Sequence, residues 1–505
     1  MTISDIGEIH IDAAHCLIGS GGMQFEGGGQ LELEAYLSNL AAMREESVAA
    51  ALATGGITND GSGDDDDDSD SDSDSDDDDE TQVVYLEFNP GEPTFPVILV
   101  LDGQAVGSLV FDDYIYTQED RDLIQSRLES DYQLYDYEFT QVQPASGEFS
   151  TLTFGDNDGG NIALNIVTGG VSILFGRAEN IDFRNNNRSD NAFIDGSFWR
   201  FVAELDRANG TSNLQNFSGI PVEKASDIDL VERLAVVNQS SNTGSHELGH
   251  IQGLRHHDSI GAPGDGLPPG VDPFDYLPLG ETDQNAFETI LHTMASGASV
   301  GLPLTGSTIE DRFFAERSAV KMAVNADIED RVRKESKVRG KLKLAGLDTP
   351  NPLEAGVNAG LELKTKASLI AGRLDVIDEV DSYKFKGKAG QVFNAEVISF
   401  SDVDFAEPII GLLVLSQKMN DGSLVELTRN RLTFEGIEPM IIDFELPEKG
   451  DYVLQVSSPS TIDFGGGLVF PLSLFGLGGF EVGDYDLHAY IVEGEADDDD
   501  DSDSD

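Results

Sequence analysis

The spacing of apolar and polar residues divides the chain into two regions with different patterns. Between residues 81 and 325, short apolar runs alternate with stretches of helical periodicity. Strands are expected at TQVVYLEFN, YEFTQV, FSTLTFG and GVSILFG. A capping-box-like start at 117–120 predicts one helix, and others are expected over 225–254, either continuous or interrupted near 238–244, and over 309–324. This region therefore predicts an α+β domain, with a mixed twisted sheet plus helices.

From about residue 345 to 494 the pattern changes to short alternating strands separated by turn residues. The candidates are SYKFKG, VFNAEVIS, IIGLLVL, MIIDFEL, DYVLQV and YDLHAYIV, and no helical stretch lies among them. Such a density of strands predicts an all-β sandwich or jelly roll over residues 350–494.

The remaining segments are predicted to connect or flank these two domains. Residues 1–63 are weakly patterned and are interpreted as a weakly structured segment or a pro-region, with one candidate helix from Leu31 to Leu52. Residues 64–80 are 13 acids and 4 serines, a composition that cannot collapse, so they predict a disordered linker. Residues 495–505 predict a similar acidic tail. The basic cluster in 326–349 is interpreted as a linker at the domain boundary.

Composition excludes some partners. Asp and Glu number 94 against 31 Lys and Arg, a net charge of -63, so nucleic acid is not an expected partner. No window approaches the ~20 apolar residues of a membrane span. The single cysteine cannot form an intrachain disulfide, and the first residues show no secretory signal. Neither the export route nor the oligomeric state can be predicted from the sequence.

Half of the 8 histidines fall in the fourteen residues SHELGHIQGLRHHD. His246 and His250 are four apart, so a helix places both imidazoles on one face, where they can share a metal ion. Glu247 follows the first of them, which is the position of a general base acting on metal-bound water. A straight helix cannot surround a tetrahedral ion, so a third ligand must come from beyond it.

Gly253 supplies the turn that the third ligand needs. Glycine tolerates positive φ, so the helix can stop there and the chain can return. His256 then reaches the ion, or His257 does if the turn is one residue longer. Three neutral imidazoles leave a fourth position open for water, which is typical of catalytic Zn²⁺. His257 and Asp258 are otherwise expected to support the ligands by hydrogen bonds.

The extended pattern H-E-x-x-H-x-x-G-x-x-H resembles that of the metzincin metallopeptidases, with a matrixin-like look, over about residues 82–325. The resemblance implies a methionine in a tight turn beneath the zinc, and Met294 fits. Astacin-like members carry a tyrosine two residues later, where this chain has Ser296, so a tyrosine ligand is not expected. His292 is expected to be a packed or hydrogen-bonding neighbour of this site.

The same resemblance implies structural Ca²⁺, which matrixin-like enzymes often hold in loops. Oxygen donors gather at Asp156 and Asp158 and again at Glu179 and Asp182. Loop turns that use Asn and Asp for backbone reasons explain both segments equally well.

The second region resembles the bacterial pre-peptidase C-terminal domain. It has a D-x-Y-x-F pattern within 378–391, a G-x-Y-x-L-x-V strand within 447–456 and a related strand start at 483–487. That family is a β-sandwich appended to secreted peptidases, so the resemblance implies a secreted protein. Together the two resemblances predict a secreted zinc endopeptidase acting on protein or peptide substrates. The alternative is an acidic calcium-binding surface or adhesion protein with a vestigial metallopeptidase fold.

Overall fold

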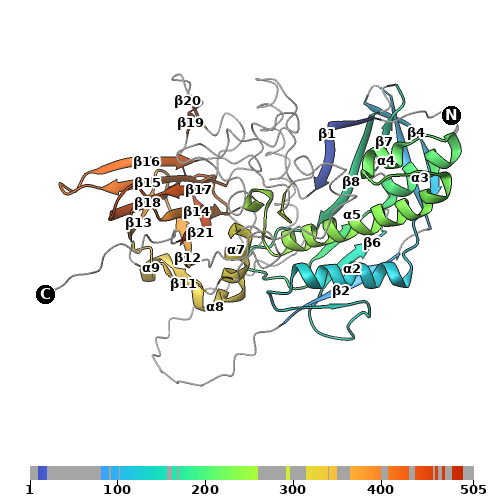
Figure 1. The fold of residues 1–505 in the computed structure, drawn as a ribbon. Helices are drawn as coiled ribbons and strands as arrows, with labels where there is room; N and C mark the ends of the chain where they lie inside the picture. The colour runs from blue at the N-terminus through green and yellow to red at the C-terminus, as the bar shows by residue number, and fades with distance from the viewer. Residues whose placement is uncertain are drawn as a thin grey trace, which may run out of the picture.

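The structure of the chain is a computed structural model (Figure 1). This structure describes residues 10–19, 81–89, 93–101, 103–155, 162–167, 170–259, 292–295, 314, 316–338, 340–347, 349, 364–399, 408–430, 438–458, 461–463, 469–471 and 480–492. The predicted helix at 31–52, the acidic linker at 64–80 and the tail at 495–505 lie outside these residues.

In the described residues the first domain is built on a nine-stranded mixed sheet, in the order β4-β3-β7-β8-β9-β6-β2-β5, with β1 also paired to β8. The predicted strands are present as β2, β5, β6 and β8, whereas β1, β3, β4, β7 and β9 were not predicted. Two of these, β7 and β9, are only four residues long and give a weak alternation signal. The bounds are β1 (His10–Gly19), β2 (Gln82–Phe88), β3 (Thr94–Leu101), β4 (Gln104–Asp112), β5 (Tyr137–Thr140), β6 (Ser150–Phe154), β7 (Ile162–Asn165), β8 (Gly170–Ala178) and β9 (Asn191–Ile194).

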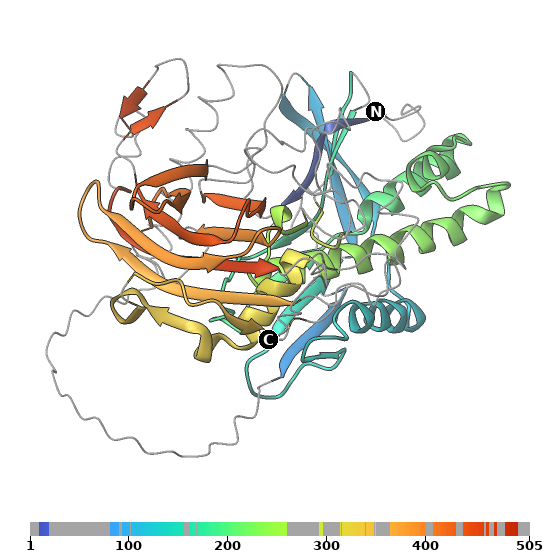
Figure 2. The ribbon, with the colours of Figure 1, turned by 60° about the vertical axis from the view of Figure 1, so that its left-hand side comes forward.

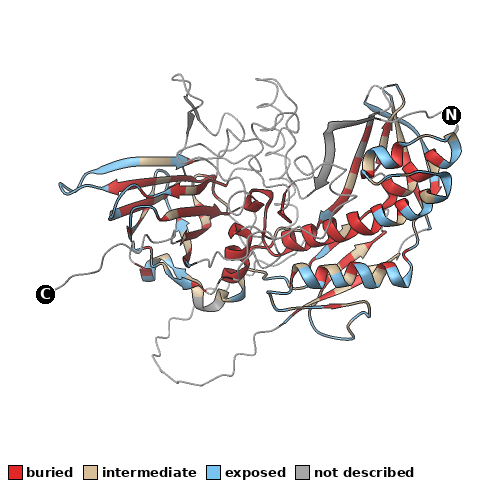
Figure 3. Ribbon diagram, in the orientation of Figure 1, coloured by how far each residue is buried: buried red, intermediate tan, exposed pale blue. Residues whose placement is uncertain are grey.

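Helices pack on this sheet around one long central helix (Figures 1 and 3). The central helix α5 (Ile228–Ile251) lies against β6, β8 and β9, and α2 (Gln118–Asp131) and α3 (Ser197–Asn209) pack beside it. The short α4 (Asn213–Ser218) and the 3₁₀ turn η2 (Ala225–Asp227) precede α5. The predicted capping box of α2 is confirmed, with Thr117 and Asp120 bonding reciprocally.

The central helix is continuous, so the interruption considered near 238–244 is wrong. Every residue from 238 to 245 is buried, which explains how so polar a run can be helical. The polar side chains there have partners inside the protein: Gln239 donates to Thr243 (3.0 Å), and Ser241 donates to the Val237 carbonyl (2.9 Å). Other elements supply further polar partners, since Tyr116 lies 2.8 Å from Ser240 and Arg127 donates to Asn238 (2.9 Å), so the composition does not mark a loop.

The second region is a β-sandwich, as predicted. One sheet has the order β10-β12-β21-β14-β17 with β11 paired to β12, and the other has the order β13-β18-β15-β16. Aromatic and aliphatic side chains from both sheets, including Tyr383, Phe393 and Leu454, fill the space between them. The bounds are β12 (Thr365–Leu374), β13 (Val380–Gly387), β14 (Val392–Ile398), β15 (Leu412–Lys418), β16 (Leu424–Asn430), β17 (Met440–Glu445), β18 (Gly450–Ser457), β21 (Gly483–Val492) and a small hairpin of β19 (Thr461–Asp463) and β20 (Val469–Pro471).

The segment 326–349 is part of the sandwich, so its interpretation as a linker is wrong. It contains α8 (Ile328–Arg331), β10 (Val332–Lys334), α9 (Glu335–Val338) and β11 (Ala345–Leu347). Both strands pair with β12, and Val338 and Leu342 belong to the sandwich core. The density of basic residues hid the alternation, since exposed basic side chains stand between these apolar anchors at Arg333, Lys334, Lys337, Lys341 and Lys343.

The helix α7 (Glu316–Ala326) joins the two domains (Figures 1 and 2). Its Val320 and Val324 share one apolar cluster with Phe183 of the first domain and with Leu369 and Tyr490 of the sandwich. The predicted helix at 309–324 thus corresponds to α7, with 309–313 outside the described residues. No helix in the described part of the chain is long and apolar enough to cross a membrane.

The domain junction holds a buried acid that should make stability depend on pH. Glu316 is 6% exposed, and burial together with nearby Asp443 raises its pKa to about 8, against the opposing effect of Arg317. In the unfolded chain this group ionises near its ordinary pKa, so its contribution to stability is complete below about pH 4.5 and is lost as pH rises toward 8. Glutamine does not ionise, so the Glu316→Gln variant does not lose this stability as pH rises. The free energy of unfolding of Glu316→Gln relative to the wild type should increase by roughly 2–4 kcal/mol between pH 5 and pH 8.

Chemical denaturation of both proteins across this pH range measures the difference. Glu138→Gln, at an exposed position of β5, is the control and should show no such pH-dependent gain. Parallel pH profiles for the wild type and Glu316→Gln would show that Glu316 is not held protonated.

Candidate metal centre

The last two turns of α5 present the first two histidines. His246 and His250 lie one turn apart, and their Nε2 atoms are 3.0 Å from each other. Both side chains are almost fully buried, at 2% and 0% exposure. The helix that carries them is held by its packing on β8 and β9, so the two rings have a fixed position relative to the sheet.

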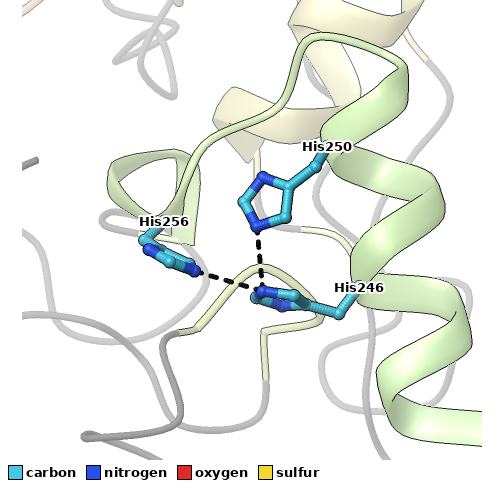
Figure 4. Close-up of side chains that lie close together, drawn as sticks. All are labelled: His246, His250 and His256. Carbon is cyan, nitrogen blue, oxygen red and sulfur yellow. Dashed lines mark hydrogen bonds between the residues drawn. The ribbon is translucent and has the colours of Figure 1, made fainter. Parts of the chain in front are cut away.

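The chain turns back immediately after α5. Gly253 has φ +83°, and a Cβ there would lie 2.6 Å from the Cα of Phe183, so both the conformation and the space require glycine. The turn is closed by the Leu254 amide, which donates to the Gly249 carbonyl (2.9 Å). A 3₁₀ turn, η3 (His256–Ser259), follows and brings the Nε2 of His256 to 3.1 Å from that of His246 (Figure 4).

Hydrogen bonds fix the tautomers of two of these rings. The Nδ1 of His246 bonds to the Thr293 carbonyl (2.8 Å), and the Nδ1 of His250 bonds to the Leu254 carbonyl (2.8 Å). Because a carbonyl only accepts, each Nδ1 must carry the proton, and each neutral ring then points an Nε2 lone pair inward. Two lone pairs 3.0 Å apart repel unless a positive charge, either a proton or a metal ion, lies between them.

The donor set fits Zn²⁺. Imidazole nitrogens bind zinc at ~2.0–2.1 Å, which places nitrogens in a tetrahedral site roughly 3.4 Å apart. The observed separations of 3.0 and 3.1 Å are a few tenths of an ångström shorter. In the described residues, His246, His250 and His256 form one of two groups of three whose ligand atoms lie within 4.8 Å of one another.

The turn that contains Met294 lies against this group. The Ala295 amide donates to the His292 carbonyl (3.0 Å), which closes the turn. Met294 is fully buried, and its Sδ lies 2.4 Å from where a Cβ on Gly249 would stand. The methionine thus packs against α5 between His246 and His250, while the neighbouring carbonyl of Thr293 orients His246. Ser296 lies outside the described residues.

Glu247 is buried between α5 and β8. A Cβ on Gly176 of β8 would stand 2.7 Å from the Oε1 of Glu247 and 2.4 Å from Thr243, so the absence of a side chain makes room for the carboxyl group. Burial raises the pKa of Glu247 to about 8, and the charges of His256 and Arg177 and the backbone amide of Ala178 partly oppose this.

The strand that covers Glu247 has neighbours on both sides. Ile173 of β8 pairs with Cys16 of β1 and with Ile162 of β7, and Arg177 pairs with Gly19 and Phe193. The segment 10–19, from the region predicted to be weakly structured or a pro-region, therefore runs parallel to β8 (Figure 1).

The other residues predicted to lie near the site form hydrogen bonds or ion pairs with groups other than the three converging histidines. The Nε2 of His257 lies 3.1 Å from the Oε1 of Glu396 on β14, and Asp258 accepts from the Arg255 amide (2.8 Å) and from Lys321 (2.8 Å). The Nδ1 of His292 bonds to the carbonyl of Ser259. Sequence reasoning missed the partner Glu396, and the one local signal for it is a single acid between apolar residues in VFNAEVI.

The candidate calcium residues are placed only in part. Asp156 and Asp158 lie outside the described residues. Glu179 is exposed and accepts from Asn191 (2.8 Å), while Asp182 is buried and accepts from the backbone amide of Asn187 (2.7 Å). The bond of Asp182 belongs to a turn, which is the backbone role that Asp favours in loops. A Ca²⁺ site stays a prediction.

Comparison with known proteins does not identify a family for this chain. No protein-family model matches the chain, and no curated protein matches it. Among solved structures, the pre-peptidase C-terminal domain of a collagenase from Bacillus anthracis is similar at 18% identity over 24% of this chain and 87% of that chain, with a TM-score of 0.16. A periplasmic inhibitor of g-type lysozyme from Aeromonas hydrophila is similar at 16% identity over 25% and 85%, also with a TM-score of 0.16. These TM-scores are too low for the matches to bear on function.

Proposed function

We propose that this protein is a zinc-dependent endopeptidase of the metzincin type. The observation that carries the proposal is the convergence of three histidine Nε2 atoms, two of which present lone pairs because their Nδ1 atoms donate to carbonyls. A glutamate follows the first histidine directly and is buried against β8. The secreted location and the protein or peptide substrates belong to the same proposal and rest on the resemblance of the sequence motifs.

The residues of the chain have distinct roles in this proposal. His246, His250 and His256 would hold the ion and leave one position free for water or substrate. Bound Zn²⁺ would lower the pKa of that water to about 7 and polarise the substrate carbonyl. Glu247, whose raised pKa a bound Zn²⁺ would lower by favouring the ionised carboxylate, would accept the proton of the attacking water and return it to the leaving amine. The Thr293 carbonyl orients the His246 ring and the Leu254 carbonyl orients the His250 ring, while Met294 packs against Gly249 between these two residues.

The direct test uses purified protein with its zinc content measured. A proteome-derived peptide library is incubated with the protein, with and without a chelator, and cleavage products are identified by mass spectrometry. New termini that disappear with the chelator and return on adding Zn²⁺ are expected. A protein that binds one zinc ion yet cleaves nothing in the library would refute the proposal.

Gly176→Ala should reduce peptidase activity without removing zinc. The added Cβ would stand 2.7 Å from the Oε1 of Glu247, so either the carboxyl group or β8 must shift. Overpacking of this kind costs roughly 1–3 kcal/mol, and misplacing the base by about 1 Å lowers kcat on the order of 10²-fold. Steady-state kinetics, thermal unfolding and zinc content are measured on the same preparation.

The matched control is Gly107→Ala in β4, where a Cβ meets nothing within 4 Å. That variant should retain wild-type kcat. If Gly176→Ala retains kcat while its melting temperature falls, the space beside β8 matters for packing alone.

A further inference from the structure

The residues on both sides of the third histidine are tied to the C-terminal sandwich. On one side, Arg255 forms an ion pair with Glu438, which also accepts from the Ser399 amide (2.5 Å) at the end of β14. On the other side, His257 lies 3.1 Å from Glu396 in the middle of β14. His256 therefore belongs to a turn whose two neighbouring side chains are both held by the sandwich.

Lys321 of α7 links the same turn to the same strand. Its Nζ lies 2.8 Å from the Oδ2 of Asp258 and 2.8 Å from the Oε2 of Glu396. Arg317, one turn earlier on α7, has its Nε 3.9 Å from the Oδ1 of Asp258 and also donates to Asn394 of β14. Two carboxylates and two cations thus balance one another in a space closed to water.

Burial makes this network sensitive to the loss of any member. The side chains of His257, Asp258, Lys321 and Glu396 are at most 2% exposed. Charges removed from water depend on their partners, and one left without its partner is strongly destabilised. Burial by itself would raise the pKa of Glu396, but Lys321 and His257 hold it well below its usual range, so this acid is ionised.

We propose that the C-terminal sandwich is a structural part of the metal centre, in which Glu396 and Lys321 are positioning residues for His256. They hold η3 through His257 and Asp258, and η3 directs the His256 ring toward His246. The inference rests on the proposed zinc site and assigns the sandwich a role in forming it. It also implies that the sandwich cannot be released without loss of metal affinity.

A second metal ion among His257, Asp258 and Glu396 is the competing interpretation, because their ligand atoms also lie within 4.8 Å of one another. The ammonium group of Lys321 already lies at hydrogen-bond distance from both carboxylates. A divalent ion there would bring a further charge next to that buried cation, so the geometry favours the lysine as the cation of this group.

The experiment measures zinc affinity in the full chain by competition with a chelator of known affinity. The variants are Glu396→Gln, Lys321→Met and the double variant, which removes both charges together. Each single variant should weaken zinc binding roughly 10–100-fold, as loss of groups behind metal ligands does. The double variant should weaken it by less than the product of the two, since both act through η3. Cobalt-substituted protein should show an altered visible spectrum in the same variants.

The matched control is Asp486→Asn, which removes another buried contact between the domains, the ion pair with Arg184 (2.6 Å). It should lower the melting temperature of the metal-free protein and change zinc affinity by less than twofold. Zinc affinity within twofold of wild type in a folded Glu396→Gln or in the folded double variant would overturn the inference. Two zinc ions per wild-type chain, falling to one in Glu396→Gln, would also overturn it in favour of a second metal site. A wild-type chain that binds no zinc would refute the proposed function itself.

Discussion

Replacing Glu247 with glutamine is expected to lower kcat by roughly 10²–10⁴-fold while zinc content stays at that of the wild type. Glutamine has nearly the same volume, so it fits the space that Gly176 leaves beside β8. Its amide cannot take a proton from water at neutral pH, so only the proton transfer is removed. Steady-state kinetics on a peptide substrate identified from the library, together with metal analysis of the same sample, measure both quantities.

Glu232→Gln is the control for this variant. Glu232 is a buried acid on the same helix, 2% exposed, and it pairs with Arg200 (3.0 Å) at the end remote from the histidines. Its loss should reduce stability and leave kcat unchanged. If Glu247→Gln keeps wild-type kcat with zinc bound, another group must take the proton and the assignment of the base is wrong.

The convergence of the three histidines could be predicted because helical geometry makes their spacing meaningful. His246 and His250 share a face in any helix, and Gly253 marks the turn that follows. The groups that complete the site come from distant parts of the chain. Thr293 contributes through its carbonyl, which no side-chain pattern reveals, and Glu396 pairs with a residue 139 positions away. Contacts of this kind depend on tertiary packing, and the only local sign of Glu396 is an acid placed among the apolar residues of β14.

The elements of the fold were likewise predicted where the signal is local and missed where the structure depends on distant contacts. A strand with clear alternation, such as β13, was predicted because one of its faces is buried. The polar run of α5 suggested an interruption because its partners, such as Tyr116 beside Ser240 (2.8 Å), lie elsewhere in the chain. The segment 326–349 was misjudged because its exposed basic residues outnumber its few apolar anchors. In both places tertiary packing decided the structure against local composition.

His256→Ala should abolish stoichiometric zinc binding, whereas His257→Ala should only weaken it. The free energy of zinc binding, ~10–16 kcal/mol, is shared among three or four ligands. Losing one ligand should therefore weaken zinc affinity on the order of a thousandfold or more. His257 directs its Nε2 to Glu396, 3.1 Å away, and acts on the ion only through the position of η3. Its loss should therefore weaken affinity by roughly tenfold. Zinc per chain after dialysis against graded chelator concentrations distinguishes the two variants.

Each variant serves as the other's control, because the two residues are adjacent in one 3₁₀ turn and both are buried. A general loss of folding would affect zinc binding equally in both, and circular dichroism of the metal-free proteins detects it. The reverse order, with His257→Ala abolishing binding and His256→Ala retaining it, would show that the turn after Gly253 is longer by one residue in the metal-bound protein. In that event the pairing of His257 with Glu396 would not survive metal binding, and the sandwich could not support the site through that contact.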